Sequence, residues 1–134
     1  MIDVAAAVII QDQKLLLVKQ KNHDYWTPPG GLVDDGESPE EACVRETKEE
    51  IGVEVEILAP LRVQRRWWSE KQCDIDVYNF LTIIKSGEPH CIDNSDCGDV
   101  EDIAWVKMSD LNSYGVPPGT DEIFGECLVR QEDL

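Results

Sequence analysis

Three glutamates near the middle of the chain have the spacing that brings side chains together on one face of an α-helix. Glu46, Glu49 and Glu50 lie three and four residues apart, so in a helix their carboxylates share a sector of roughly 100°. Like charges at this spacing repel each other unless a cation lies between them. Since Mg²⁺ prefers oxygen ligands and is usually held by a few carboxylates together with phosphate oxygens, the pattern indicates a divalent-metal site. The alternative is a solvated acidic face that Arg45 and Lys48 partly neutralise.

Two neighbouring features favour the metal site. Arg45 precedes Glu46 by one residue and Glu49 by four, so its guanidinium is placed to orient a carboxylate. Gly30 and Gly31 come shortly before the helix, where a backbone carbonyl in a turn is a further oxygen ligand of the kind that Mg²⁺ prefers. Carboxylates, an orienting cation and a carbonyl together match the ligands that such a cation takes.

The helix that carries these residues has clear start and stop signals. Ser38 is a favoured N-cap residue, Pro39 suits the first helical position, and Glu41 completes a capping box. Gly52 is a residue type that typically ends a helix. The sequence therefore predicts a helix of about 13 residues between Ser38 and Gly52.

Apolar runs on both sides of this helix predict strands. A hairpin is expected from 4–10 and 14–18, and a second helix close to the end of the chain, at 121–131. Residues 26–31, rich in proline and glycine, are expected to be loop. The fold class that follows is α/β: one domain, residues 1–134, with a mixed sheet flanked by two helices. Further strands are predicted at 53–58, 61–68, 74–84 and 103–108, and further loops at 86–102 and 112–120.

The charge balance restricts the partners. Asp and Glu number 28 against 12 Lys and Arg, a net charge of −16, which disfavours an extended nucleic-acid interface or an acidic membrane surface. The charge favours bound cations, or it serves solubility alone. The five cysteines form no CxxC pair, and the chain shows no signal peptide and no apolar run long enough to span a membrane. A cytoplasmic protein is expected.

The most basic and aromatic patch is Arg65, Arg66, Trp67 and Trp68. On a strand, alternate side chains point to opposite faces, so only one Arg–Trp pair can face a given cleft. The functional hypothesis is a tryptophan stacked on a nucleobase beside an arginine on phosphate. The alternative is that one tryptophan is core and the other covers the sheet. Core packing is expected for the other two tryptophans and surface positions for both histidines: Trp26, Trp105, His23 and His90.

Taken together, the helix and its lead-in resemble the Nudix box, here residues 31–53. The box is a glycine, a glutamate, an Arg-Glu pair, a Glu-Glu pair and a closing glycine at fixed intervals. One position departs from the pattern, because Thr47 stands where the family usually has an aliphatic residue, on the face away from the carboxylates. The matching residues are Gly31, Glu37, Arg45, Glu46, Glu49, Glu50, Gly52 and Val53.

The resemblance implies an α/β/α sandwich and metal-dependent hydrolysis of a nucleoside diphosphate linked to another moiety. The metal, Mg²⁺ or Mn²⁺, would be held by Glu46, Glu49, Glu50 and the Gly30 carbonyl. Arg45 would act within the catalytic set and, with Glu37, orient the helix. The general base differs among members of the family; here the alternatives are Glu46 or Glu49, or a loop acid among Asp99, Glu101 and Asp102.

The substrate within the family stays open. Members selective for ADP-ribose tend to carry a proline about sixteen residues past the box, where this chain has Ser69. The short chain resembles members that act on nucleoside triphosphates, so cleavage of a (d)NTP to a (d)NMP and pyrophosphate is the leading hypothesis. The alternatives are a nucleotide-sugar pyrophosphatase such as one for ADP-ribose, a nucleotide-sensing module that does not hydrolyse, and a structural protein with an accidental match. A monomer or a homodimer is expected.

Overall fold

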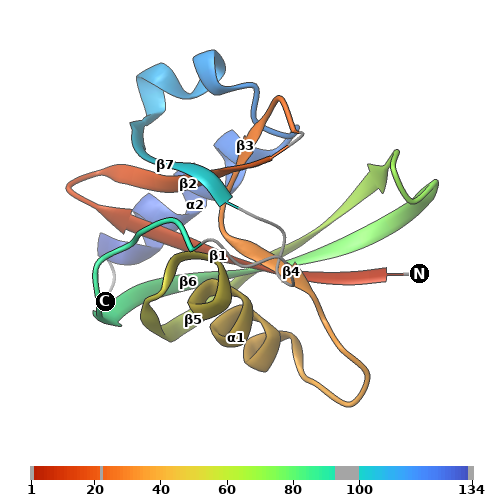
Figure 1. Ribbon diagram of the computed structural model, residues 1–134. Helices are drawn as coiled ribbons and strands as arrows, with labels where there is room; N and C mark the ends of the chain where they lie inside the picture. The colour runs from red at the N-terminus through yellow and green to blue at the C-terminus, as the bar shows by residue number, and fades with distance from the viewer. Residues whose placement is uncertain (1, 22, 93–99, 133–134) are drawn as a thin grey trace.

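The structure is a computed structural model that describes residues 2–21, 23–92 and 100–132 (Figure 1). No helix in these ranges is long and apolar enough to cross a membrane. In chain order the elements are β1 (Ile2–Gln11), β2 (Lys14–Gln20), β3 (Trp26–Thr27), β4 (Gly30–Leu32), α1 (Pro39–Ile51), β5 (Glu54–Trp68), β6 (Cys73–Ser86), β7 (Val100–Lys107), the 3₁₀ helix η1 (Met108–Tyr114) and α2 (Thr120–Glu132).

β1 is the central strand of a mixed sheet. The order is β3-β2-β1-β6-β5, with β4 paired to β1 and β7 paired to β2. β1 runs parallel to β6 and antiparallel to both β2 and β4. Its first half pairs with β4 (Val4 with Leu32) and its end with β2 (Ile10 with Leu15). A strand enclosed in this way has to be apolar, which explains the run of alanine, valine and isoleucine in β1.

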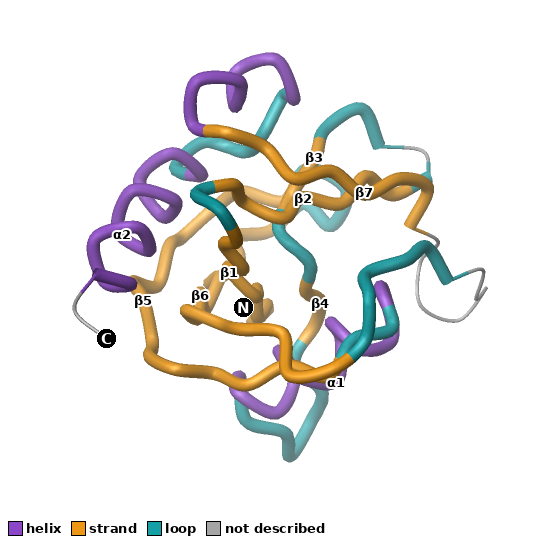
Figure 2. The backbone as a smooth tube through the Cα atoms, turned by 90° about the vertical axis from the view of Figure 1, so that its left-hand side faces the viewer, coloured by secondary structure: helices purple, strands orange, loops and turns teal. Residues whose placement is uncertain are grey.

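The two helices cover opposite faces of the sheet, as Figures 1 and 2 show. Alternate residues of β1 enter different cores, as the period of two in a strand requires. Ala5, Ala7 and Ile9 pack in the core that includes Cys43 of α1. Val8 and Ile10 pack in the core of α2, which also holds Ile123, Phe124 and Cys127. The expected α/β class with a mixed sheet between helices is confirmed.

Two local predictions were wrong, both near prolines. Residues 26–31, expected as loop, contain the short strands β3 and β4 on either side of Pro28 and Pro29. Gly30 can pair closely with β1 because glycine has no Cβ. A Cβ at this position would overlap the Ala5 carbonyl oxygen. The two strands expected at 53–58 and 61–68 are one strand, β5, whose register shifts around Pro60. A proline at a bulge removes no ladder hydrogen bond, so the strand continues.

The later segments differ from expectation mainly in extent. The loop expected at 86–102 ends where β7 begins, at Val100; its residues 93–99 lie outside the described ranges. Part of the connection expected at 112–120 belongs to η1, and α2 begins at Thr120. Periodicity locates strands and helices better than it locates their ends.

The bounds of α1 agree with the prediction, including its caps. Ser38 accepts from the Glu41 N–H, the Glu41 side chain accepts from the Ser38 N–H, and Gly52 ends the helix in the left-handed region at φ 74°. Thr47 is fully buried. Its hydroxyl donates to the Cys43 carbonyl at 2.7 Å, so the polar departure from the family pattern is satisfied inside the helix.

Ser38→Ala is expected to lower the free energy of unfolding by about 1 kcal/mol, because the substitution removes the side-chain half of the capping box. Urea denaturation followed by circular dichroism measures this loss. Ser113→Ala, at an exposed position in η1, is the control and should leave the midpoint nearly unchanged. Equal stabilities for the two variants would contradict the role assigned to the cap.

Candidate active site

Arg45 joins the segment before α1 to the acidic face of α1. Its guanidinium donates twice to Glu37, at 2.7 and 2.9 Å, and once to the Leu32 carbonyl at 3.1 Å. One nitrogen, Nη1, reaches both Glu46 at 2.8 Å and Glu49 at 3.1 Å. The hydrogen bonds from Arg45 hold the pKa of Glu37 low, at about 2. The ionised Glu37 therefore fixes the guanidinium of Arg45, and the guanidinium orients the carboxylates of Glu46 and Glu49.

Glu46 lies directly over Gly31. A Cβ at Gly31 would come within 2.6 Å of Glu46 Oε2, so the glycine leaves the space that the carboxylate occupies. The Glu46 side chain is only 16% exposed. Burial raises its pKa, and the hydrogen bond from Arg45 opposes that rise. The Glu46 carboxylate is thus partly buried between α1 and β4.

Glu50 is the most buried of the three glutamates, at 2% exposure. It accepts from the Gly30 N–H at 2.7 Å and from Gln20 Nε2 at 3.1 Å. Both donors are neutral, and burial raises the pKa of Glu50 to about 8. A buried carboxylate that is held by neutral donors is costly when ionised, which is the chemistry that a bound cation relieves. At Gly30 it is the backbone N–H that contacts Glu50.

The donor set fits a hard divalent cation. Arg45 contacts three of the glutamates, Glu37, Glu46 and Glu49. Glu50 lies beside them on the helix and has only neutral donors, and every available ligand atom is oxygen. Within the described residues no three acidic, histidine or cysteine side chains already stand at metal-binding distance. A cation would have to compete with Arg45 for Glu46 and Glu49, so the side chains must rotate to receive it.

The loop acids proposed as alternative bases fall near one end of β7. Asp99 lies outside the described residues. Glu101 forms an ion pair with Lys19 at 2.6 Å, and that contact lowers its pKa. Asp102 accepts from the N–H of the next residue at 2.8 Å. These contacts direct Glu101 to β2 and Asp102 to its own strand rather than to the glutamates of α1.

A pocket of about 480 Å³ reaches the same two glycines that Glu50 and Glu46 contact. One wall is the end of β5 with the following turn, and the other is the segment between β2 and β3. Its lining is largely apolar. The larger polar and aromatic side chains of the two walls include Arg66, Trp67, Trp68, Glu70, His23 and Tyr25.

The structure separates the residues of the basic aromatic patch. Arg65 points to the opposite side of β5 and pairs with Asp76 at 3.0 Å; it does not line the pocket. Arg66 and Trp68 face the pocket, and Trp68 also packs against a small core cluster. Trp67 stands at the rim, 59% exposed. Alternation along the strand predicted that only one arginine would face a cleft, and tertiary structure selects Arg66.

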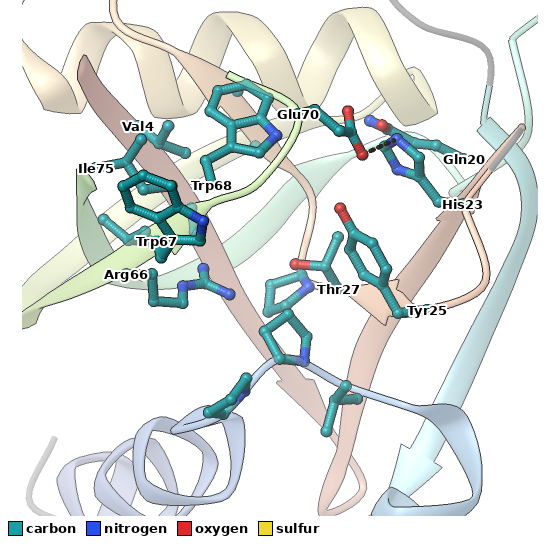
Figure 3. A pocket seen from close by; sticks show the side chains of 18 of the residues that line it. Val4, Gln20, His23, Tyr25, Thr27, Arg66, Trp67, Trp68, Glu70 and Ile75 are labelled. Atoms are coloured by element: carbon teal, nitrogen blue, oxygen red, sulfur yellow. Dashed lines mark ion pairs between the residues drawn. The ribbon is translucent and has the colours of Figure 1, made fainter. Parts of the chain in front are cut away.

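Several pocket residues carried no sequence signal. His23, expected at the surface, is only 21% exposed in its side chain, stacks on Tyr25 at 5.1 Å between ring centroids and pairs with Glu70 at 3.3 Å (Figure 3). His23 and Tyr25 lie far from Glu70 in the chain, so no spacing could relate them to it. Trp26 and Trp105 pack in the two cores as expected. His90 packs over Gly52 at the end of α1.

Comparisons with known proteins agree with this geometry. The family model described as "NUDIX domain" matches residues 1–127. A putative 8-oxo-dGTP diphosphatase of Bacillus subtilis strain 168 is 48% identical over 111 residues, 82% of this chain and 68% of that protein. An ADP-ribose pyrophosphatase of Methanocaldococcus jannaschii is 49% identical over 49 residues, only 34% of this chain and 29% of that protein. The crystal structure of a MutT NUDIX hydrolase from Burkholderia pseudomallei, 28% identical, superimposes with a TM-score of 0.79 over 92% of this chain and 95% of that one.

Gly31→Ala is expected to lower kcat strongly while the protein still folds, because the new methyl group displaces the Glu46 carboxylate from its place over β4. The measurement is the turnover of a nucleotide substrate, with circular dichroism as a check of folding. Gly125→Ala in α2, where a Cβ meets nothing within 4 Å, is the matched control and should keep full turnover. Full turnover of Gly31→Ala would contradict the position assigned to Glu46.

Glu50→Gln is expected to stabilise the metal-free protein at alkaline pH. Burial raises the pKa of Glu50 from 4.5 to about 8, so the folded state keeps a proton that the unfolded chain loses. The stability contribution of Glu50 therefore falls as pH rises through this window, and glutamine escapes the fall. In EDTA, the Tm of the variant minus that of the wild type should increase from about pH 5 to about pH 8.5. A difference that does not change with pH would contradict the burial of an ionisable Glu50.

Proposed function

Because the chain belongs to the Nudix family and is a hydrolase of nucleotide pyrophosphate bonds, we propose that it converts (d)NTPs to (d)NMPs and pyrophosphate. One observation carries the proposal: a pocket lined by aromatic side chains and the carboxylates of α1 meet at Gly30 and Gly31. A ligand with an aromatic end and an anionic end spans both parts. A nucleotide has this shape, with its base in the pocket and its phosphates at α1.

The metal site of the proposal uses the glutamates of α1. Glu46, Glu49 and Glu50 hold Mg²⁺, or Mn²⁺ in its place, with the Gly30 carbonyl as a further ligand. When bound, such a cation neutralises charge on phosphoryl oxygens and lowers the pKa of water. Arg45 keeps Glu46 and Glu49 in position through its bonds to Glu37, and the pair orients the helix.

Glu46 is better placed as a proton acceptor than the loop acids Glu101 and Asp102. Burial raises its pKa, which makes the carboxylate a stronger base near neutral pH. Glu101 is engaged by Lys19 and has a lowered pKa, and Asp102 turns back to its own strand. A proton taken by Glu46 from the attacking water leaves an oxygen nucleophile that adds to phosphorus, and the bond to the bridging oxygen of the leaving group breaks.

The triphosphate is favoured over a nucleotide sugar by the extent of the similarity. The relative named for 8-oxo-dGTP matches 82% of this chain, whereas the relative named for ADP-ribose matches 34%. Small nucleotides also suit a protein with a net charge of −16, which disfavours extended nucleic acid. We place the protein in the cytoplasm, as a monomer or a homodimer.

Release of pyrophosphate and nucleoside monophosphate is expected from triphosphates in Mg²⁺ and not in EDTA. Glu49→Gln and Glu50→Gln should each lower kcat by roughly a hundredfold or more, because each removes a charged ligand. The panel contains nucleoside triphosphates, nucleotide sugars and dinucleotides, with products separated by chromatography.

Glu40→Gln is the matched control, since Glu40 is an exposed glutamate in the first turn of the same helix. It should keep wild-type turnover. Turnover of nucleotide sugars alone would overturn the choice of substrate. Tight nucleotide binding without turnover of any compound in Mg²⁺ would overturn the catalytic assignment and favour a sensing module.

A further inference from the structure

Arg66 is a charged residue in a largely apolar pocket, and part of its guanidinium has no partner. Its Nε atom is buried and makes no hydrogen bond in the described part of the chain. Burial lowers the pKa of Arg66, with the phenol of Tyr25 as a smaller opposing influence. A buried donor without an acceptor loses its hydrogen bonds to water and gains none in return, which costs free energy. The protein therefore tolerates a cost at Arg66 that a ligand with acceptor atoms would remove.

The position of Arg66 separates it from the phosphate end of the site. Gly31 pairs with Ala5, which pairs with Tyr78 on β6, whereas Arg66 lies opposite Ile75, three residues farther along β6. Three residues correspond to about 10 Å along a strand, and the three strand spacings from β4 through β1 and β6 to β5 add about 14 Å across the sheet, so Arg66 lies well away from the phosphate end of the site. With the phosphates at the carboxylates of α1, the base rather than a phosphate reaches Arg66.

The surroundings of Arg66 also suit a base. Trp67, Trp68 and Tyr25 line the same pocket, with Trp68 on the face of β5 that carries Arg66 (Figure 3). Flat aromatic side chains bind a base by stacking whatever its identity. Stacking therefore supplies affinity, and a hydrogen-bonding side chain has to supply the choice between bases.

A guanidinium can only donate, and this decides which base it accepts. Guanine presents two acceptors side by side, O6 and N7, to which arginine donates in pairs. Adenine presents N7 beside an amino group, which is itself a donor and opposes the guanidinium. We propose that Arg66 is the specificity-determining residue of the pocket and selects 6-oxopurine nucleotides, the guanine class, over adenine nucleotides. The inference rests on the proposed function only in taking a nucleotide as the ligand.

The first test measures binding without catalysis. In EDTA, titration calorimetry of the wild type should show GMP bound more tightly than AMP by roughly ten- to a hundredfold. Arg66→Gln should bring the two affinities to within about threefold, by weakening GMP more than AMP. The matched control is Arg65→Gln, the neighbouring arginine on the opposite side of β5, which should keep the preference. Equal affinity of the wild type for GMP and AMP would overturn the inference.

The second test uses base analogues on the wild type, so it does not depend on the folding of a variant. IMP keeps O6 and N7 and should bind about as well as GMP. The 2-aminopurine nucleotide lacks O6 and should bind about as weakly as AMP. If the 2-aminopurine nucleotide binds as well as GMP, Arg66 does not read O6 and the inference is wrong.

Turnover in Mg²⁺ separates this inference from the proposed function. The ratio of kcat/KM for GTP to that for ATP should fall in Arg66→Gln and stay in Arg65→Gln. An equal loss on both substrates would mean that Arg66 contacts the phosphates or the sugar, which overturns the inference and leaves the hydrolase intact. Preference for GMP in EDTA without turnover of any triphosphate would support the inference while the proposed function fails.

Discussion

The site depends on one imbalance of charge: three glutamates contact a single arginine, and a fourth, Glu50, is buried on the same helix. Arg45 bonds to Glu37 ahead of the helix and to Glu46 and Glu49 on it, while Glu50 is buried with two neutral donors. Such an arrangement persists only if the fold holds it, since the carboxylates repel one another. The fold therefore concentrates acidic side chains at α1, where a bound cation would relieve their repulsion.

Packing at two glycines makes this arrangement possible. Gly30 lets β4 approach the Ala5 carbonyl oxygen, and its N–H reaches Glu50. Gly31 leaves room for the Glu46 carboxylate. The capped helix then fixes the angle at which the glutamates approach β4. Helix, short strand and central strand thus hold the carboxylates at one point of the sheet.

The other half of the site, the pocket, is apolar where the helix face is charged. Where α1 concentrates charge, the pocket beyond Gly30 and Gly31 is largely apolar and contains aromatic rings with one buried guanidinium. A nucleotide has the same division, with an anionic chain at one end and a stacking base at the other. The separation lets one ligand satisfy both environments, which explains how an acidic protein can bind an anion.

The sequence alone determined the parts that rest on local rules. The caps of α1, the shared face of Glu46, Glu49 and Glu50, and the alternation of Arg65 and Arg66 follow from helix and strand periodicity. Most strands were also predictable from their apolar patterns, because each pattern lies within one continuous segment. The family was predictable for the same reason, since the residues of the box lie at fixed intervals in a single stretch of chain.

Tertiary structure decided what depends on contacts between distant segments. It buried Glu50 more deeply than Glu49 although the two are neighbours, and it directed Arg66 rather than Arg65 into the pocket. It also brought His23 to Glu70 and placed Gly30 and Gly31, expected as loop, in the strand β4. Periodicity states which side chains share a face, but burial, partners and cavities depend on what the rest of the chain places against that face.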